Sequence, residues 1–155
     1  MLHIDLPTRA EILSLAETRG APCVTIYLST TPLTEDAQAD RISLKNLAKE
    51  AMRQLAAVDT PKRSLWPLEA AIAEIEDDDR FWAHQANSLA IFLTPDSART
   101  YRLPTKMENQ VHVSDRFHLK PILRAVTFPH DCYILAVGMG AVRLIEVSPD
   151  LPPHP

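Results

Sequence analysis

The sequence predicts an α/β (α+β) fold, in which a mixed or largely antiparallel sheet packs with three to four helices and a C-terminal β-hairpin follows. Short β-branched apolar runs predict the strands, and apolar residues at three- and four-residue steps predict the helices. The length of 155 residues suits one domain plus part of another. We therefore expect an α/β domain over residues 1–128, a hairpin over residues 129–148, and a linker or tail over residues 149–155.

Two helices are predicted in the first third of the chain. Thr8 and Glu11 form a capping box, because each side chain can bond the backbone amide of the other residue, and a helix is expected over residues 9–19. From about residue 40 to residue 58, apolar side chains return every three or four positions, which is typical of a helix with one buried face. The polar, aperiodic residues 30–40 indicate a loop before this helix.

A third helix, a short helical turn and a final short helix are predicted further along. Pro67 suits the first turn of the third helix, because the amide that proline lacks has no partner there. The acidic residues that follow oppose the helix dipole, so the helix should end near Asp77. Asp78 or Asp79 can then cap a short turn, and the last helix falls within residues 115–126.

The strands are predicted from runs that are rich in β-branched, aromatic and aliphatic residues and are bounded by turn-forming residues. Neighbouring antiparallel strands joined by short turns are the most economical topology for them. A hairpin is expected around Gly138 and Gly140, whereas the prolines after Pro149 should continue neither a sheet nor a helix. The predicted strands cover residues 23–28, 89–93, 99–103, 108–113, 132–137 and 141–147.

Composition excludes several classes of function. The chain has three glycines, too few in any window for a Walker loop or a dinucleotide-binding fingerprint. No Gly-x-Ser-x-Gly sequence occurs, so the nucleophile elbow of a hydrolase is also excluded. The formal charge of −4 argues against a surface that is basic throughout, but it allows a local basic patch. We expect neither enzymatic activity nor a small-molecule cofactor.

Two groups of residues could bind a metal ion. His112, Asp115 and His118 supply metal-type donors within seven residues, but the directions of the two histidines are unknown. The stronger alternative is a capping role for Asp115 or Ser114, with the histidines solvated or hydrogen-bonded. The acidic residues 74–79 could hold Mg²⁺ if they converged, although a solvated acidic surface is favoured. We therefore assign no metal site.

Cysteine usage and the N-terminal sequence bear on the compartment. Cys23 and Cys132 each lie in an apolar run, which favours two buried thiols over a disulfide. Residues 1–6 lack the basic and apolar regions of a signal peptide, and no apolar run is long enough to cross a membrane. These features predict a cytoplasmic protein that does not bind membranes.

A row of basic residues is the strongest candidate for a binding surface. Basic side chains recur every fourth residue along the predicted second helix, so they form one ridge that could follow an RNA backbone or could simply be solvated. Trp66, Phe81 and Trp82 could stack on bases, but core positions are favoured for them. The ridge consists of Arg41, Lys45, Lys49 and Arg53.

Four segments taken together resemble the N-terminal region of bacterial proteins related to the archaeal–eukaryotic peptide-chain release factors. The strings Phe-Trp-x-His-Gln (81–85) and Arg-Phe-His-Leu-Lys-Pro (116–121) are the most specific features of this resemblance. The hairpin at 132–147 is similar to the opening strands of that superfamily's ribonuclease H-like middle domain. The resembling segments are residues 24–30, 41–47, 79–93 and 114–123.

The resemblance implies a non-catalytic module of a translation-associated factor that binds the ribosome or RNA. The Gly-Gly-Gln tripeptide of true release factors is missing, so no catalytic residue is carried over. The implied contact surface comprises the 30–40 loop, the second helix and the residues Arg116, His118 and Lys120. The alternatives are a protein–protein interaction domain without nucleic-acid contact and, more distantly, a small metal-dependent hydrolase.

The hairpin also predicts association. If the middle domain is incomplete, the 132–147 hairpin must pair with the first sheet, pack on it, or contact another chain, because an isolated two-stranded hairpin is marginal in water. An unpaired strand edge is a template for further pairing. We therefore expect a homodimer through the edge of this hairpin.

Overall fold

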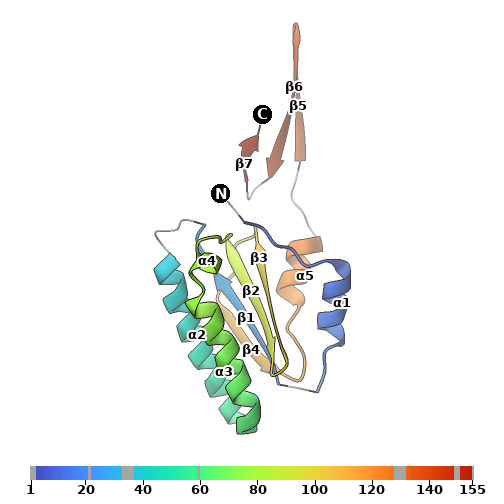
Figure 1. Ribbon diagram of the computed structural model, residues 1–155. Helices are drawn as coiled ribbons and strands as arrows, with labels where there is room; N and C mark the ends of the chain where they lie inside the picture. Colours follow the sequence, from blue (N-terminus) through green and yellow to red (C-terminus); the bar gives the residue numbers. More distant parts are fainter. Residues whose placement is uncertain are drawn as a thin grey trace.

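The computed structural model describes residues 3–20, 22–32, 37–58, 60–127, 132–148 and 151–154 (Figure 1). It contains a four-stranded sheet in the order β3-β2-β1-β4 and a three-stranded sheet in the order β5-β6-β7. Every strand pair is antiparallel. The predicted fold class is confirmed, with the antiparallel form of the sheet realised.

The first sheet contains the four strands that were predicted for the first domain. β1 and β2 are central and almost wholly buried, as their apolar sequences require. β2 and β3 form a tight hairpin, whereas β4 pairs with β1 on the far edge, so the connection at 104–109 crosses from one side of the sheet to the other. The bounds are β1 (Cys23–Ser29), β2 (Ser88–Thr94), β3 (Ser97–Leu103) and β4 (Gln110–Ser114).

Helices cover both faces of this sheet. Figure 1 shows α2 and α3 side by side on one face, with α1 and α5 on the other. No helix in the described part of the chain has both the length and the apolar character needed to cross a membrane. The bounds are α1 (Arg9–Glu17), α2 (Ala37–Ala57), α3 (Lys62–Asp77), α4 (Asp79–Trp82) and α5 (Lys120–Thr127).

The alternation of side chains along the strands produces two cores. Val24, Ile26 and Leu28 of β1 face α2 and α3, where Leu44 and Leu68 are fully buried against them. The intervening residues of β1 face the other way. Cys23 and Tyr27 therefore pack in a second core with Leu15 of α1, with Ile122 of α5 and with Phe117, which precedes α5. The Cys23 thiol is buried as predicted, and burial raises its pKa, whereas the side chain of Cys132 lies outside the described residues.

Local capping signals in the sequence are confirmed. The Thr8 amide donates to the Glu11 carboxylate over 2.7 Å, and the Glu11 amide donates to the Thr8 hydroxyl over 3.3 Å, which completes the capping box of α1. Asp78 caps α4, since its carboxylate accepts from the Phe81 amide over 2.9 Å. Side chains that bond within three residues need no tertiary context, so both features were visible in the sequence.

The predicted start of α3 was wrong. The helix begins at Lys62, directly after Pro61, so Pro67 lies in its interior rather than in its first turn. Proline cannot donate to the carbonyl four residues earlier, and Arg63 therefore lacks that helical bond. Burial of Leu68 and Ile72 against the sheet compensates for the loss.

The second sheet is built from β5 (Cys132–Gly138), β6 (Ala141–Ser148) and β7 (Leu151–His154), and Gly140 turns between the first two with a φ of +89°. Residues 149–155 were predicted to be a linker or tail, but Leu151–His154 pairs with β6. The two prolines of β7 are tolerated because an edge strand can leave amide positions unpaired. The hairpin therefore shares no strand with the first sheet (Figure 1).

Candidate nucleic-acid interface

The predicted ridge on α2 does not act as a uniform row of free charges. The Arg41 guanidinium pairs with the carboxylate of Asp79 in α4, lies 5.9 Å from the centroid of the Trp82 ring, and has a side chain that is 25% exposed. These contacts tie the first turns of α2 to α4. Arg41 therefore serves packing, because its charge is already neutralised.

Arg53, at the other end of the ridge, is also paired. Its Nε and Nη2 atoms donate to both carboxylate oxygens of Glu50, over 2.8 and 2.7 Å. These hydrogen bonds and a further one from Gln54 hold the pKa of Glu50 down to about 2. The Arg53 side chain is nevertheless 72% exposed, so an incoming phosphate could compete with Glu50 for its outer face.

Lys45 and Lys49 are exposed, as Arg53 is, but no ion pair is recorded for either of them within the described residues. They follow the solvent side of α2. Leu44, Ala48 and Ala51 on the opposite side of the helix are buried. Two of the four predicted cations are therefore available to a phosphate backbone without breaking a contact.

Trp66 is the unexpected feature of this region. Core burial was favoured for it, but its side chain is 73% exposed, whereas Trp82 is 1% exposed. Trp66 lies one turn after Lys62 and Arg63 on the same helix, and spacings of three and four residues place all three on one face of α3. Glu69, which starts the acidic part of the helix, is one turn further on.

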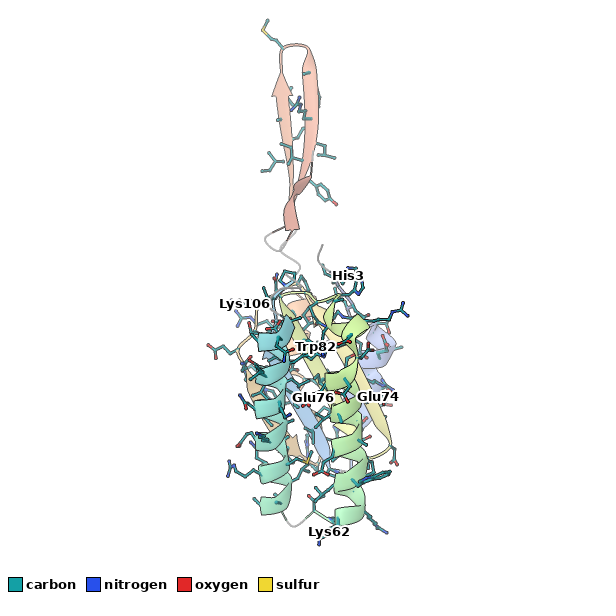
Figure 2. The ribbon with its side chains drawn as sticks, turned by 60° about the vertical axis from the view of Figure 1, so that its left-hand side comes forward. His3, Lys62, Glu74, Glu76, Trp82 and Lys106 are labelled. Atoms are coloured by element: carbon teal, nitrogen blue, oxygen red, sulfur yellow. The ribbon has the colours of Figure 1, made fainter. Side chains whose placement is uncertain are left out.

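The α2–α3 connection gathers these groups at one end of the helical layer. Figure 2 shows Lys62 at the end where α2 and α3 are joined and Trp82 near the opposite end. We use the name basic end for the side chains of the last turns of α2 and the first turns of α3. The basic end consists of Lys49, Arg53, Lys62, Arg63 and Trp66.

The charges on α3 oppose its dipole at both ends. Its first turn contains Lys62 and Arg63 and no acid, and its last turn contains Glu74, Glu76 and Asp77 and no base. A helix N-terminus carries partial positive charge, so each of these charges costs some tenths of a kcal/mol in helix stability, on the order of 0.3–1.

The second predicted group, Arg116, His118 and Lys120, lies on the other face of the sheet, because the adjoining Phe117 packs in the core beneath α1 and α5. Arg116 is engaged with the Asp115 carboxylate at 3.1 Å. The predicted contact surface therefore does not form one continuous patch with α2. The 30–40 loop cannot be placed in it either, since residues 33–36 lie outside the described residues.

His112 and His118 do come together. Their rings stack with centroids 4.0 Å apart and an interplanar angle of 26°. Burial, and then the repulsion of a second imidazolium on His118, lowers the pKa of His112. Asp115 does not complete a metal site, since its carboxylate bonds Arg116 and Ser114. No group of three metal-binding side chains forms in the described ranges, the acidic end of α3 included.

The comparisons with known proteins add no assignment. No protein-family model matches this sequence, and no curated protein matches it. The release-factor resemblance stays a prediction that rests on the segments quoted above.

Proposed function

We propose that this chain is a cytoplasmic, non-catalytic module of a translation-associated factor that binds RNA, free or within the ribosome, through the basic end. The observation that carries the proposal is the 73% exposure of Trp66 beside two cations on one helix face. An aromatic ring provides a stacking platform for an unpaired base, and neighbouring cations neutralise the flanking phosphates. The release-factor resemblance supports the translational context.

The proposal is tested by fluorescence anisotropy with a labelled twelve-nucleotide oligouridylate at low salt. Trp66→Ala should weaken binding by about 5- to 160-fold, because a base–aromatic stack contributes roughly 1–3 kcal/mol. Trp66→Phe should retain most of the affinity, since a smaller ring can still stack. Equal binding by wild type and Trp66→Ala would refute the platform.

Charge reversal gives a second test that separates binding from folding. Lys62→Glu with Arg63→Glu should abolish RNA binding and yet raise stability slightly, because acids at a helix N-terminus interact favourably with the dipole. Lys45→Glu with Lys49→Glu tests the ridge in the same way. Arg9→Glu, at the first residue of α1, is the matched control for a reversed charge at a helix N-terminus and should leave binding unchanged.

The second candidate is a protein–protein interaction domain, and the β5–β6 hairpin favours it. β5 forms an edge of its sheet, and an apolar edge strand is a template for pairing with another chain. We propose that the partner is a second copy of this chain, paired antiparallel along β5. The exposed apolar side chains of the hairpin include Ile134, Leu135, Val137, Val142 and Leu144.

A further inference from the structure

A cavity lies on the opposite side of the sheet from α2, between the 104–109 connection and α5. Its volume is about 830 Å³, within the range of roughly 300–1,000 Å³ that is usual for small-molecule sites. Lys106, His118, Lys120 and Arg124 contribute to its wall, and Met107 and Pro121 give it an apolar part. None of these residues belongs to the basic end.

The connection that forms one wall is fixed by hydrogen bonds to the ends of the central strands. The Asn87 side chain donates to the carbonyl of Pro104 over 2.6 Å, and the Met107 amide donates to the Ser88 hydroxyl over 2.7 Å. The amide of Ser29 donates to the side chain of Asn109 over 2.7 Å. The wall is therefore preorganised, so little conformational entropy of this segment is lost when a ligand binds.

The opposite wall is held by β1. The buried Tyr27 hydroxyl donates to the His118 carbonyl over 2.7 Å, and the His118 amide donates to the Thr25 hydroxyl over 3.0 Å. The His118 ring is fixed from its other side by the stack on His112. Both backbone groups of His118 are thus hydrogen-bonded, and these bonds together with the ring stack fix the position of this residue at the cavity.

The charge of the cavity is positive, although the chain as a whole carries −4. Lys106, Lys120 and Arg124 line it against a single acid, Glu108, and no ion pair is recorded for the three cations within the described ranges. Lys120 and Arg124 lie four residues apart on α5, where like charges repel across one helix face. A multivalent anion between them would remove this repulsion.

We propose that this cavity binds a nucleoside phosphate with two or more phosphate groups. Three cations from two separate segments suit a polyphosphate, and a guanidinium can bond two of its oxygens at once. Met107 and Pro121 offer a surface for the base, since an unbranched thioether adapts to a flat ring. The Glu108 carboxylate can accept hydrogen bonds from ribose hydroxyls.

The test is isothermal titration calorimetry of the full chain with ADP, pyrophosphate and adenosine as separate probes. ADP should bind most tightly of the three. Lys120→Ala and Arg124→Ala should each weaken ADP binding by about tenfold or more, since each removes a hydrogen bond to a charged group. Both side chains are exposed, so the fold should survive either change. Lys45→Ala, which removes an exposed lysine from the other face, is the matched control.

Three results would overturn the proposal. Absence of heat with millimolar ADP would show that the cavity takes no such ligand, and unchanged affinity in both variants would place the ligand elsewhere. Pyrophosphate binding as tightly as ADP would remove the nucleoside from the assignment. Trp66→Ala should leave ADP binding intact, so failure here is distinguishable from failure of RNA binding at the basic end.

Discussion

Trp82→Ala should lower the stability of the fold, whereas Trp66→Ala should leave stability nearly unchanged and weaken RNA binding. Trp82 is 1% exposed, its indole Nε1 donates to the carbonyl of Ile75 over 2.8 Å, and its ring meets Phe81 edge to face at 5.7 Å. Trp66 is 73% exposed, and no hydrogen bond is recorded for it in the described part of the chain. The two substitutions are chemically identical, so they compare the environments alone.

The magnitude follows from these contacts. Truncating a buried tryptophan to alanine costs about 3–5 kcal/mol in the free energy of unfolding, and the Ile75 carbonyl left without its partner places Trp82→Ala towards the upper end. With a urea m-value of about 2 kcal/mol/M, the unfolding midpoint should fall by roughly 2 M. Trp66→Ala should change the free energy of unfolding by less than about 0.5 kcal/mol, which is a shift of under about 0.3 M.

Urea titration should be followed by far-UV circular dichroism, which reports the secondary structure of both variants on one scale. Tryptophan fluorescence would not, because each variant has lost a different fluorophore. The reasoning is refuted if Trp66→Ala lowers the midpoint as much as Trp82→Ala does. Trp66 would then be packed in the core, and its ring could not be offered to a base.

Three further outcomes are expected. Asp78→Ala should lower the free energy of unfolding by about 1 kcal/mol in urea titration, because the Phe81 amide loses its cap, whereas Asp78→Asn should cost only a few tenths. The pKa of His112 is lowered by burial and by His118, so the folded state binds fewer protons than the unfolded state. The melting temperature should therefore fall as the pH drops below about 6.5. An equal fall in the His112→Gln variant would contradict this. Light scattering of the intact chain should show a concentration-dependent dimer that Leu135→Lys disrupts, and a monomer at high concentration would exclude association through β5.

The sequence predicted those parts of the fold that depend on short-range chemistry. The capping box at Thr8 and the buried strand at Cys23–Ser29 were recognisable because their residues interact with immediate neighbours or follow a strict period. The start of α3 was predicted wrongly from Pro67 because that prediction also relied on short-range chemistry alone. The preference of proline for a first turn is a local rule, and burial of Leu68 on the sheet overrode it.

The candidate sites depend on long-range placement, which a single sequence does not encode visibly. Trp66 and Trp82 each follow an apolar residue in the sequence, Leu65 and Phe81, yet the packing of α3 and α4 exposes the first tryptophan and buries the second. Lys106 and Arg124 are isolated cations in the sequence, and pairing of β4 with β1 brings them to one cavity. The spacings that join Lys62 and Arg63 to Trp66, and Lys120 to Arg124, were present in the sequence, but the first became a helix face only once α3 was seen to begin at Lys62.

The salt dependence of RNA affinity tests the central claim most directly. Contacts with three to four phosphates should give a slope of about −2 to −3 in a plot of log K against log salt concentration, since single strands release roughly 0.7 counterions per contact. The account predicts this slope for wild type and a shallower one for the Lys62→Glu, Arg63→Glu double variant. The account would be contradicted by an affinity that does not change with salt. It would also be contradicted if no binding were measurable at about 50 mM salt, a low ionic strength at which phosphate contacts are strong.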